Sequence, residues 1–386
     1  MVNKVNEIIE KIQEELKELN EYIFRNPELG LEEYKACKAH ADLLRKYDFQ
    51  VEEEYIGIKT AFKAVKDSGK EGPTIAYLAE YDALPGIGHG CGHNLLGTTS
   101  TGAGIVLGKL ISEIGGRVIV FGTPAEENFG GKVDMVNNGS FNDVDVAMIS
   151  HPLDKYVNSG KSLAVQALQF TFKGQSAHAA AFPEKGINAL DGVINTFNNI
   201  NALREHIRSD ARIHGIIKDG GIAANIVPDL AIAQFYVRAV TKTYLEELVK
   251  KVKNCAKGAA LATGTELEIS NYEATYDNMV TNKILMETFN DNLRKLGIND
   301  IKEAESVLWS MDTGNVSHVC PTIQPSFSIS DREVVSHTIE FADATIQPLA
   351  YEGMKKTIGS LVLTASDIIQ DENLLWAIKH EFENIN

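Results

Sequence analysis

Residues 74–94 read TIAYLAEYDALPGIGHGCGHN. The segment opens with a short apolar run, which predicts a buried strand, and polar and glycine residues follow it. The segments GRVIVFGTPAEE, DVAMISHP and TIQPSFSIS repeat this pattern, and helical stretches separate the four. Such alternation predicts an α/β fold with a mostly parallel sheet and helices on both of its faces. Ligands collect beyond the carboxyl ends of the strands in a sheet of this kind.

Residues 163–272 have a different pattern. LAVQALQFTFKG alternates at period two, IVPDLAIAQFYVRAV and TELEISNYEA are further predicted strands, and two helical stretches lie between them. The order is similar to βαββαβ, which predicts an α+β, ferredoxin-like domain with an antiparallel sheet. We therefore predict that residues 163–272 are inserted into an α/β domain formed by residues 1–162 and 273–386.

The composition excludes several classes of protein. At 386 residues, the chain is longer than one hydrophobic core usually serves, which agrees with two domains. The formal net charge of -16 argues against a nucleic-acid or anionic-membrane surface, since both need clustered Lys and Arg. No stretch approaches the roughly 20 apolar residues of a membrane span. The pattern of residues 3–25 predicts a charged amphipathic helix. The segment has no apolar region of the kind found in secretory signals, so we expect a cytoplasmic protein.

The glycine-rich turn at residues 88–94 carries the first candidate site. Cys91 and His93 are two residues apart, and a thiolate and an imidazole in such a turn can both face one ion. An isolated motif of this kind has a simpler explanation, in which the turn holds a buried Cys and a helix-capping His. The interpretation as a metal site therefore needs support from other parts of the chain.

Further residues of the ligand type follow other predicted strands. Glu126 and Glu127 come after VIVFG, where one carboxylate can bind metal while the other moves protons. An exposed acidic turn is the common alternative for such a pair. His151 follows an apolar strand and His337 lies in SHTIEFA, although a single His is more often a hydrogen-bonded core residue. Four clusters at separate points of the chain together predict a metal site.

At this point the residues resemble a known family. The segments RNPELGLEE, AEYDALPGIGHGCGHN, TPAEE, GQSAHAA, AANIVP and SHTIEF occur along nearly the whole chain in this order. They are similar to landmarks of the metallopeptidase-like amidohydrolases, which include carboxypeptidase G, aminoacylase, hippurate hydrolase and aminobenzoyl-glutamate hydrolase. Asn94 replaces the Asp that many relatives have there, which resembles the sub-branch of aminobenzoyl-glutamate hydrolase and certain dipeptidases.

The resemblance implies a zinc-peptidase-like catalytic domain that holds two divalent ions, which are zinc, manganese or cobalt, and an inserted lid that forms a homodimer. The implied reaction is hydrolysis of an amide bond in an N-acyl amino acid or an aminobenzoyl-glutamate-like substrate. Glu126 falls on the position of the general base. The metal ligands implied are Cys91, His93, Glu127, His151 and His337.

Other residues take roles from the same resemblance. Asp82 matches an acid that orients a ligand, and Glu80 stands where much of the wider family has a metal-binding His. His178 matches a lid histidine that reaches the partner subunit's active site, with a lid residue that closes a turn as the alternative. Asn225 and Arg238 are implied to bind substrate, although an Arg near a strand is often only a surface ion pair.

Three rival functions remain open from the sequence. A dipeptidase or carboxypeptidase acting on small peptides cleaves the same kind of amide. A metal-free thiol hydrolase would use Cys91 with His93, but their spacing in a tight turn suits shared ligation better than base-to-nucleophile geometry. A non-catalytic partner subunit would be expected to lose Glu126 or a ligand, and this chain keeps them all.

Overall fold

The computed structural model describes residues 1–304 and 310–385. These residues divide into two compact units. The first consists of residues 1–161, 279–304 and 311–385, and the second consists of residues 162–278 with Ser310. The predicted insertion lies inside the second unit, which continues to Asn278 rather than to residue 272.

Within the described residues, six strands of the first unit form a sheet in the order β1-β2-β4-β3-β5-β13. The pairs β4–β3, β3–β5 and β5–β13 are parallel, whereas β1–β2 and β2–β4 are antiparallel. The predicted α/β class is confirmed, with a sheet that is mixed at one edge. The strands are β1 (Gln50–Glu53), β2 (Phe62–Asp67), β3 (Thr74–Ala79), β4 (Arg117–Gly122), β5 (Val146–Met148) and β13 (Thr322–Ile323).

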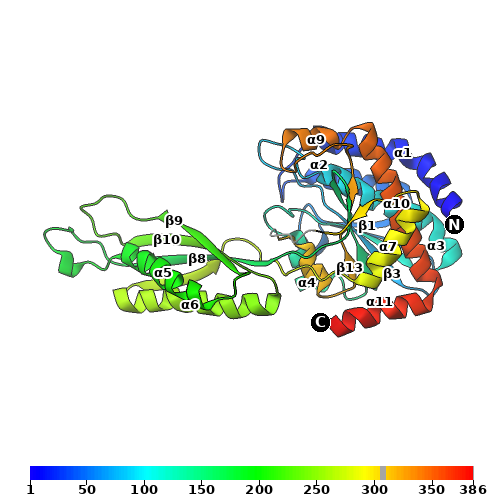
Figure 1. Cartoon of the computed structure of the whole chain (residues 1–386). Coiled ribbons are helices and arrows are strands. Elements are labelled where there is room, and N and C mark those ends of the chain that lie inside the picture. Colours follow the sequence, from blue (N-terminus) through cyan, green and yellow to red (C-terminus); the bar gives the residue numbers. More distant parts are fainter. Residues whose placement is uncertain (305–309, 386) are drawn as a thin grey trace. The chain divides into compact units, whose positions relative to one another are not determined.

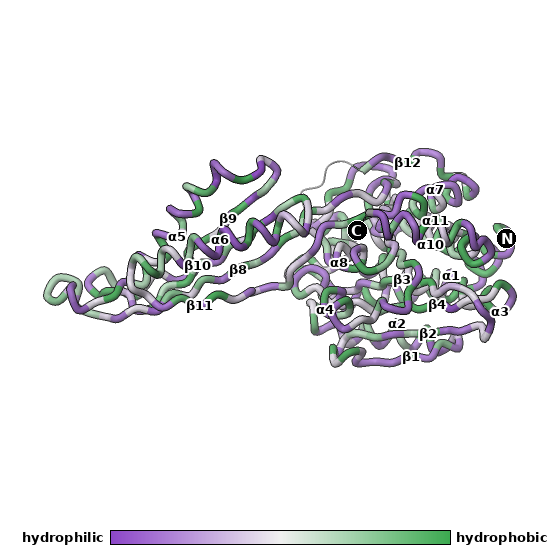
Figure 2. The backbone as a smooth tube through the Cα atoms, turned by 90° about the horizontal axis from the view of Figure 1, so that it is seen from below, coloured by the Kyte–Doolittle hydropathy of each residue, from purple (hydrophilic) through white to green (hydrophobic). Residues whose placement is uncertain are grey.

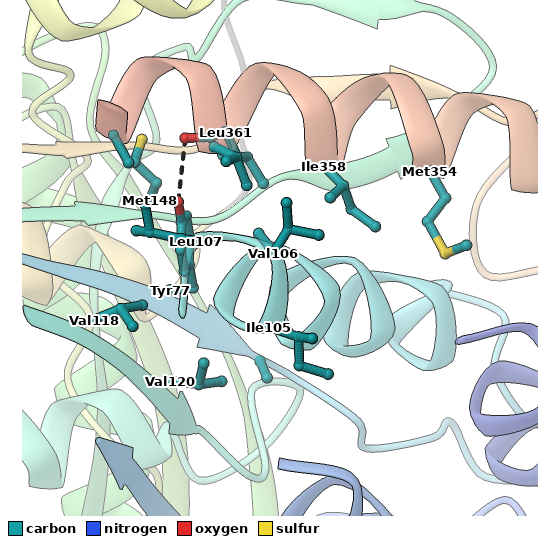
Figure 3. Close-up of a cluster of buried hydrophobic side chains, with 14 of the residues drawn as sticks. Tyr77, Ile105, Val106, Leu107, Val118, Val120, Met148, Met354, Ile358 and Leu361 are labelled. Atoms are coloured by element: carbon teal, nitrogen blue, oxygen red, sulfur yellow. Dashed lines mark hydrogen bonds between the residues drawn. The ribbon is translucent and has the colours of Figure 1, made fainter. Parts of the chain in front are cut away.

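Helices cover both faces of this sheet. Because successive side chains of a strand point to opposite faces, neighbouring residues of β3 belong to different buried clusters. Tyr77 of β3 belongs to a buried cluster with residues of α1 (Val2–Arg25), α3 (His93–Ile114) and α10 (Pro348–Gln370). Its hydroxyl donates to the carbonyl oxygen of Leu361 at 3.2 Å (Figure 3). Leu78 joins a second cluster that contains Met135 of α4. All six residues of β3 are buried, as the apolar run predicted.

The helices of the first unit are the following, in chain order (Figure 1): α1 (Val2–Arg25), α2 (Tyr34–Lys46), α3 (His93–Ile114), α4 (Gly131–Asn137), α7 (Lys283–Lys295), α8 (Thr313–Ser317), α9 (Ile339–Ala344), α10 (Pro348–Gln370) and α11 (Glu372–Ile385). The predicted amphipathic helix at residues 3–25 is α1. It buries Ile9, Leu16 and other residues that recur at helical spacing.

The short strand predicted in TIQPSFSIS is present as β13, and a second strand follows it. Residues 322–323 form β13 of the six-stranded sheet, whereas β14 (Ser326–Ser328) belongs to another sheet with β12 (Ile301–Lys302), β7 (Tyr156–Val157) and β6 (His151–Leu153). Pro325 lies between the two strands and has no N–H to donate to a ladder. Its carbonyl oxygen instead accepts from the backbone N–H of His151 at 2.9 Å.

The second unit is an α+β domain with an antiparallel sheet in the order β11-β8-β10-β9. Its helices α5 and α6 pack on this sheet and enclose an apolar core (Figure 1). Both α6 and β8 alternate between hydrophobic and hydrophilic stretches (Figure 2). The predicted βαββαβ order has four strands, but only three of them were located in the sequence, and the edge strand β9 is the fourth. The elements are β8 (Ala164–Lys173), α5 (Ala189–Leu203), β9 (Arg212–Asp219), β10 (Leu230–Ala239), α6 (Lys242–Thr263) and β11 (Glu266–Asn271).

Candidate metal centre

The residues predicted to form the site in the first unit follow β3 and β4, begin α3 and β6, or precede α9. Because β3 and β4 are parallel neighbours, the turns that follow them meet at one edge of the sheet. In chain order these residues are Asp82, Cys91, His93, Glu126, Glu127, His151 and His337.

Their ligand atoms converge. Cys91 lies in one group with His93 and His151, and in a second group with Glu127 and His337. Within each group the ligand atoms lie within 4.8 Å of one another. Since Cys91 belongs to both groups, the arrangement offers two adjacent ion positions with the thiol between them.

Asp82 holds two of these residues in place. Its Oδ1 lies 2.8 Å from Nδ1 of His93, and its Oδ2 accepts from the backbone N–H of Glu127 at 3.0 Å. Burial by itself raises the pKa of Asp82, but the interaction with His93 outweighs this effect and the pKa lies below its usual value. A carboxylate behind a ligating imidazole sets its tautomer and orientation, so Nε2 of His93 is the atom directed at the ion position.

The two other histidines are also oriented by backbone groups. Nδ1 of His151 lies 2.8 Å from the carbonyl oxygen of Pro152, and Nε2 lies 3.4 Å from Sγ of Cys91. Burial lowers the pKa of His151 to about 4, which favours the neutral imidazole that binds metal. His337 has a φ of 64°, which is a strained backbone conformation for a residue other than glycine. Its backbone N–H donates to the carbonyl oxygen of Gly90 at 2.8 Å, and this hydrogen bond helps to hold the conformation.

The donor set fits divalent cations. Nε2 of His93 and Oε1 of Glu127 are buried, and neither makes a hydrogen bond within the part of the chain that the structure describes. Nε2 of His93 lies 3.3 Å from Oε2 of Glu80, and Oε1 of Glu127 lies 3.7 Å from Nε2 of His337. A buried polar atom without a hydrogen bond costs free energy, and an ion that accepts its lone pair removes that cost. Thiolate, imidazole and carboxylate together suit zinc and neighbouring divalent metals.

Glu126 lies beside these donors, in a group with His93 and Glu127. Burial raises the pKa of Glu126 well above its usual value, and the negative charges of Glu80, Asp312 and Glu127 add to this rise. The surroundings therefore carry an excess of carboxylates, which is a further reason for the site to attract cations.

The sequence interpretation missed a buried charge cluster next to this site. The ammonium of Lys132 in α4 lies 2.6 Å from Oε1 of Glu80 and 2.7 Å from Oδ1 of Asp312, and all three side chains are buried. Oε2 of Glu80 lies 3.3 Å from Nε2 of His93, so the cluster touches the donor set. Lys132 stands in an ordinary glycine-lysine segment, and no pattern around it predicts burial.

Asn94, the departure noted in the glycine-rich turn, has structural partners. Its amide donates to Oδ1 of Asn20 and to Oγ1 of Thr345, both at 2.9 Å. These bonds tie the start of α3 to α1 and to the residue after α9. The side chain of Asn94 is buried. Among the described residues, its hydrogen bonds go to Asn20 and Thr345 and not to a predicted metal ligand.

The three predicted lid residues lie in the second unit. Nδ1 of His178 accepts from the backbone N–H of Ala181 at 3.2 Å, and the backbone of Asn225 accepts from Ala179 at 3.0 Å, so His178 and Asn225 are on adjoining segments. Arg238 lies near the C-terminal end of β10, whereas Asn225 precedes this strand. The guanidinium of Arg238 donates to the hydroxyl of Ser310 at 2.9 Å. One unit therefore brings His178 and Asn225 together but leaves Arg238 apart from them.

Comparisons with known proteins agree with this architecture. The family model described as a peptidase dimerisation domain matches residues 165–263. The chain is 35% identical to the Xaa-Arg dipeptidase of Mus musculus over 98% of this chain and 91% of that protein. It is 29% identical to one of the subunits of the p-aminobenzoyl-glutamate hydrolase of Escherichia coli, over 99% and 94% of the two chains.

A solved structure shares the fold. The Bacillus subtilis YXEP protein, described as a dinuclear metal binding peptidase from the M20 family, superposes with a TM-score of 0.70. The match covers 93% of this chain and 99% of that one at 18% identity.

The fold and the cluster of donors are those of a metal-dependent hydrolase of linear amides. The two relatives described above, which align over nearly the whole length, are a dipeptidase and a subunit of a hydrolase. The chain belongs to the M20 peptidase family. Among the helices that the structure describes, none is both long and apolar enough to span a membrane.

Proposed function

We propose that this protein hydrolyses the amide bond of an N-acyl amino acid or an aminobenzoyl-glutamate-like substrate with two divalent ions. The proposed ligands are Cys91, His93, Glu127, His151 and His337, with zinc, manganese or cobalt as the metal. The observation that carries the proposal is the convergence of these five side chains around Cys91, with one further carboxylate, Glu126, beside them. Asp82 supports the site by orienting His93.

The proposed chemistry of the chain centres on Glu126. Divalent ions lower the pKa of bound water from about 15.7 toward about 7, which makes a nucleophile available at neutral pH. Glu126 accepts the proton of the attacking water and later delivers it to the leaving nitrogen, because an amine anion is too poor a leaving group to depart unprotonated. Asp82 keeps Glu127, the residue next to Glu126, in place by accepting a hydrogen bond from the backbone N–H of Glu127.

The second unit supplies the other part of the proposal. A peptidase dimerisation domain matches residues 165–263, which supports a homodimer. His178 then stabilises the oxyanion in the active site of the partner subunit, and such a donor contributes about 2.7–4 kcal/mol in comparable sites. Asn225 and Arg238 bind substrate, and their separation along one unit agrees with a site completed by two copies.

A dipeptidase is the second candidate function. The reason is specific, since the mammalian relative at 35% identity is a dipeptidase acting on Xaa-Arg. A substrate panel of aminobenzoyl-glutamate, hippurate, acetyl-amino acids and dipeptides, including dipeptides with a C-terminal arginine, separates the two functions. The proposed main function requires the highest kcat/KM on an acylated amino acid.

Metal removal tests the reaction class. Dialysis against a strong chelator is expected to lower hydrolysis at least about 100-fold, and Zn²⁺, Mn²⁺ or Co²⁺ should restore it. Metal analysis should find two ions per chain. In the metal-loaded enzyme, mild alkylation with iodoacetamide should leave turnover intact, because Cys91 is occupied as a ligand. Chelator-resistant hydrolysis that iodoacetamide blocks would instead establish a thiol hydrolase.

Mixing two inactive variants tests the role of His178 across the interface. His178→Ala and Glu126→Gln chains, unfolded and refolded together, should recover up to roughly a quarter of wild-type activity if dimers form at random and each mixed dimer has one complete site. Each variant refolded alone is the control. If the mixture is no more active than the two variants separately, His178 acts within its own chain or not at all.

A further inference from the structure

The backbone that presents Glu126 and Glu127 is strained. Ala125 comes directly before them and has a φ of 61°, in the left-handed region that non-glycine residues rarely adopt. Its side chain is fully buried, and a Cβ built on Gly30 would lie only 2.9 Å from Cβ of Ala125. Strain of this kind persists only where the surrounding structure holds it.

Two buried carboxylates hold this turn from both sides of Glu126. Oε1 of Glu33 accepts from the backbone N–H of Ala125 at 2.8 Å. Oδ2 of Asp82 accepts from the backbone N–H of Glu127 at 3.0 Å. The amides before and after Glu126 are therefore both bound to carboxylates that come from distant segments of the chain.

Besides its contact with Ala125, the carboxyl group of Glu33 interacts with the hydroxyl of Thr60 and with its own backbone N–H. Glu33 is the N-cap residue of α2, but its side chain makes no capping hydrogen bond there. Its exposed fraction is 0%, a rare environment for a carboxyl group. Burial, followed by the charge of Asp82, raises the pKa of Glu33 to about 7, so a neutral amide is a fair replacement for this carboxyl group.

We propose that Glu33 is a positioning residue that stabilises the left-handed backbone of Ala125 and thereby aims Glu126 and Glu127 at the reacting centre. This inference rests on the proposed function, because it assigns Glu33 a task within that site. It differs from the role of Asp82, which orients His93 as well. Glu33 acts on the site through the backbone amide of Ala125, not through a hydrogen bond to a donor side chain in the described structure.

Three variants separate this role from simple packing. Glu33→Gln keeps a carbonyl oxygen to accept the N–H of Ala125, and it should retain at least about a third of wild-type kcat. Glu33→Met fills a similar volume without a good acceptor, and it should lower kcat by about 100-fold with KM nearly unchanged. Adding Ala125→Gly to Glu33→Met should raise kcat at least about tenfold, because glycine adopts a positive φ without strain.

Binding of Co²⁺ supplies a measurement that does not depend on turnover. Titration of the metal-free variants with Co²⁺, followed by absorption, should show affinity weakened by about tenfold in Glu33→Met and restored by Ala125→Gly, because the same turn carries Glu127. Ala125→Gly alone is the reference for the double variant. If Glu33→Met does not fold, recovery of the folded chain by Ala125→Gly is the corresponding readout.

The outcomes separate the two claims. If Glu33→Met keeps wild-type kcat and Co²⁺ affinity, or if Ala125→Gly rescues neither its activity nor its folding, the positioning role is overturned while the proposed function stands. If the wild-type protein binds Co²⁺ but cleaves no amide in the substrate panel, the proposed function fails. The Co²⁺ series then still tests the contact between Glu33 and Ala125.

Discussion

Glu126→Gln is expected to lower kcat about a thousandfold while both metal ions stay bound. The amide can neither take a proton from water nor return it to the leaving nitrogen, and general acid–base catalysis contributes typically 10²- to 10⁴-fold. Because Glu126 serves at both steps, we expect a loss near the middle of that range and not at its lower end. Stopped-flow or steady-state hydrolysis assays, with metal analysis on the same sample, measure both parts of this expectation.

The adjacent residue offers a matched control. Glu127→Gln changes the same side chain one position along the turn, but it removes a proposed ligand, whose Oε1 is buried without a hydrogen bond in the described structure. This variant should lose metal together with activity. If Glu126→Gln turns over at a near-normal rate, or if it loses an ion as Glu127→Gln should, the assignment of Glu126 as the base is wrong.

Lys132→Met is expected to destabilise the folded first unit by about 3–5 kcal/mol, since removal of one partner leaves buried charge uncompensated. Glu80 and Asp312 would then face each other without the ammonium that lies 2.6 Å and 2.7 Å from them. Urea unfolding with chelator present measures the loss, because bound metal would otherwise add to stability. Lys38→Met, which removes an exposed ion pair with Asp42, is the control and should cause no resolvable loss.

The loss caused by Lys132→Met should depend on pH. Burial raises the pKa of Asp312 to about 6 in the folded chain, although the attraction of Lys132 lowers it. A folded pKa above the unfolded value of about 3.9 means that the folded state binds more protons, so stability falls as pH rises through about 4 to 6. Without Lys132 this pKa rises further. The difference between the variant and the wild type should therefore be smaller at pH 5 than at pH 8.

A second substitution checks the cause. Asp312→Asn in the Lys132→Met background removes one of the two uncompensated charges and should recover part of the lost stability. An equal loss at both pH values, or no recovery in the double variant, would mean that Lys132 contributes mainly through packing of its aliphatic stem.

Much of the candidate site could be predicted because metal donors are chemically distinctive residue types. Cys91 and His93 in a glycine-rich turn, and Glu127 after an apolar strand, could be recognised without knowledge of their contacts. The parallel order of β3 and β4 then explains why these turns meet. The roles of the five proposed ligands, and of His178, Asn225 and Arg238 in the second unit, stay predictions that the experiments above address.

The buried cluster around Lys132 could not be predicted from the sequence. Whether a lysine is buried depends on partners that the fold brings to it, here Glu80 and Asp312, which lie 52 residues before it and 180 residues after it. The contact between Glu33 and Ala125, across 92 positions, has the same character. Neither involves an unusual residue type or a local spacing.

Local patterns in the sequence determined the α/β class, the amphipathic α1 and the positions of donors at strand ends, because hydrophobic periodicity and side-chain chemistry act over a few residues. Only the tertiary structure decided that TIQPSFSIS divides between two sheets, that Ala125 adopts a left-handed conformation, and that Lys132 is buried with two carboxylates. Those outcomes depend on hydrogen bonds and charge pairs between segments far apart in the chain, and their free energies exist only once the chain has folded.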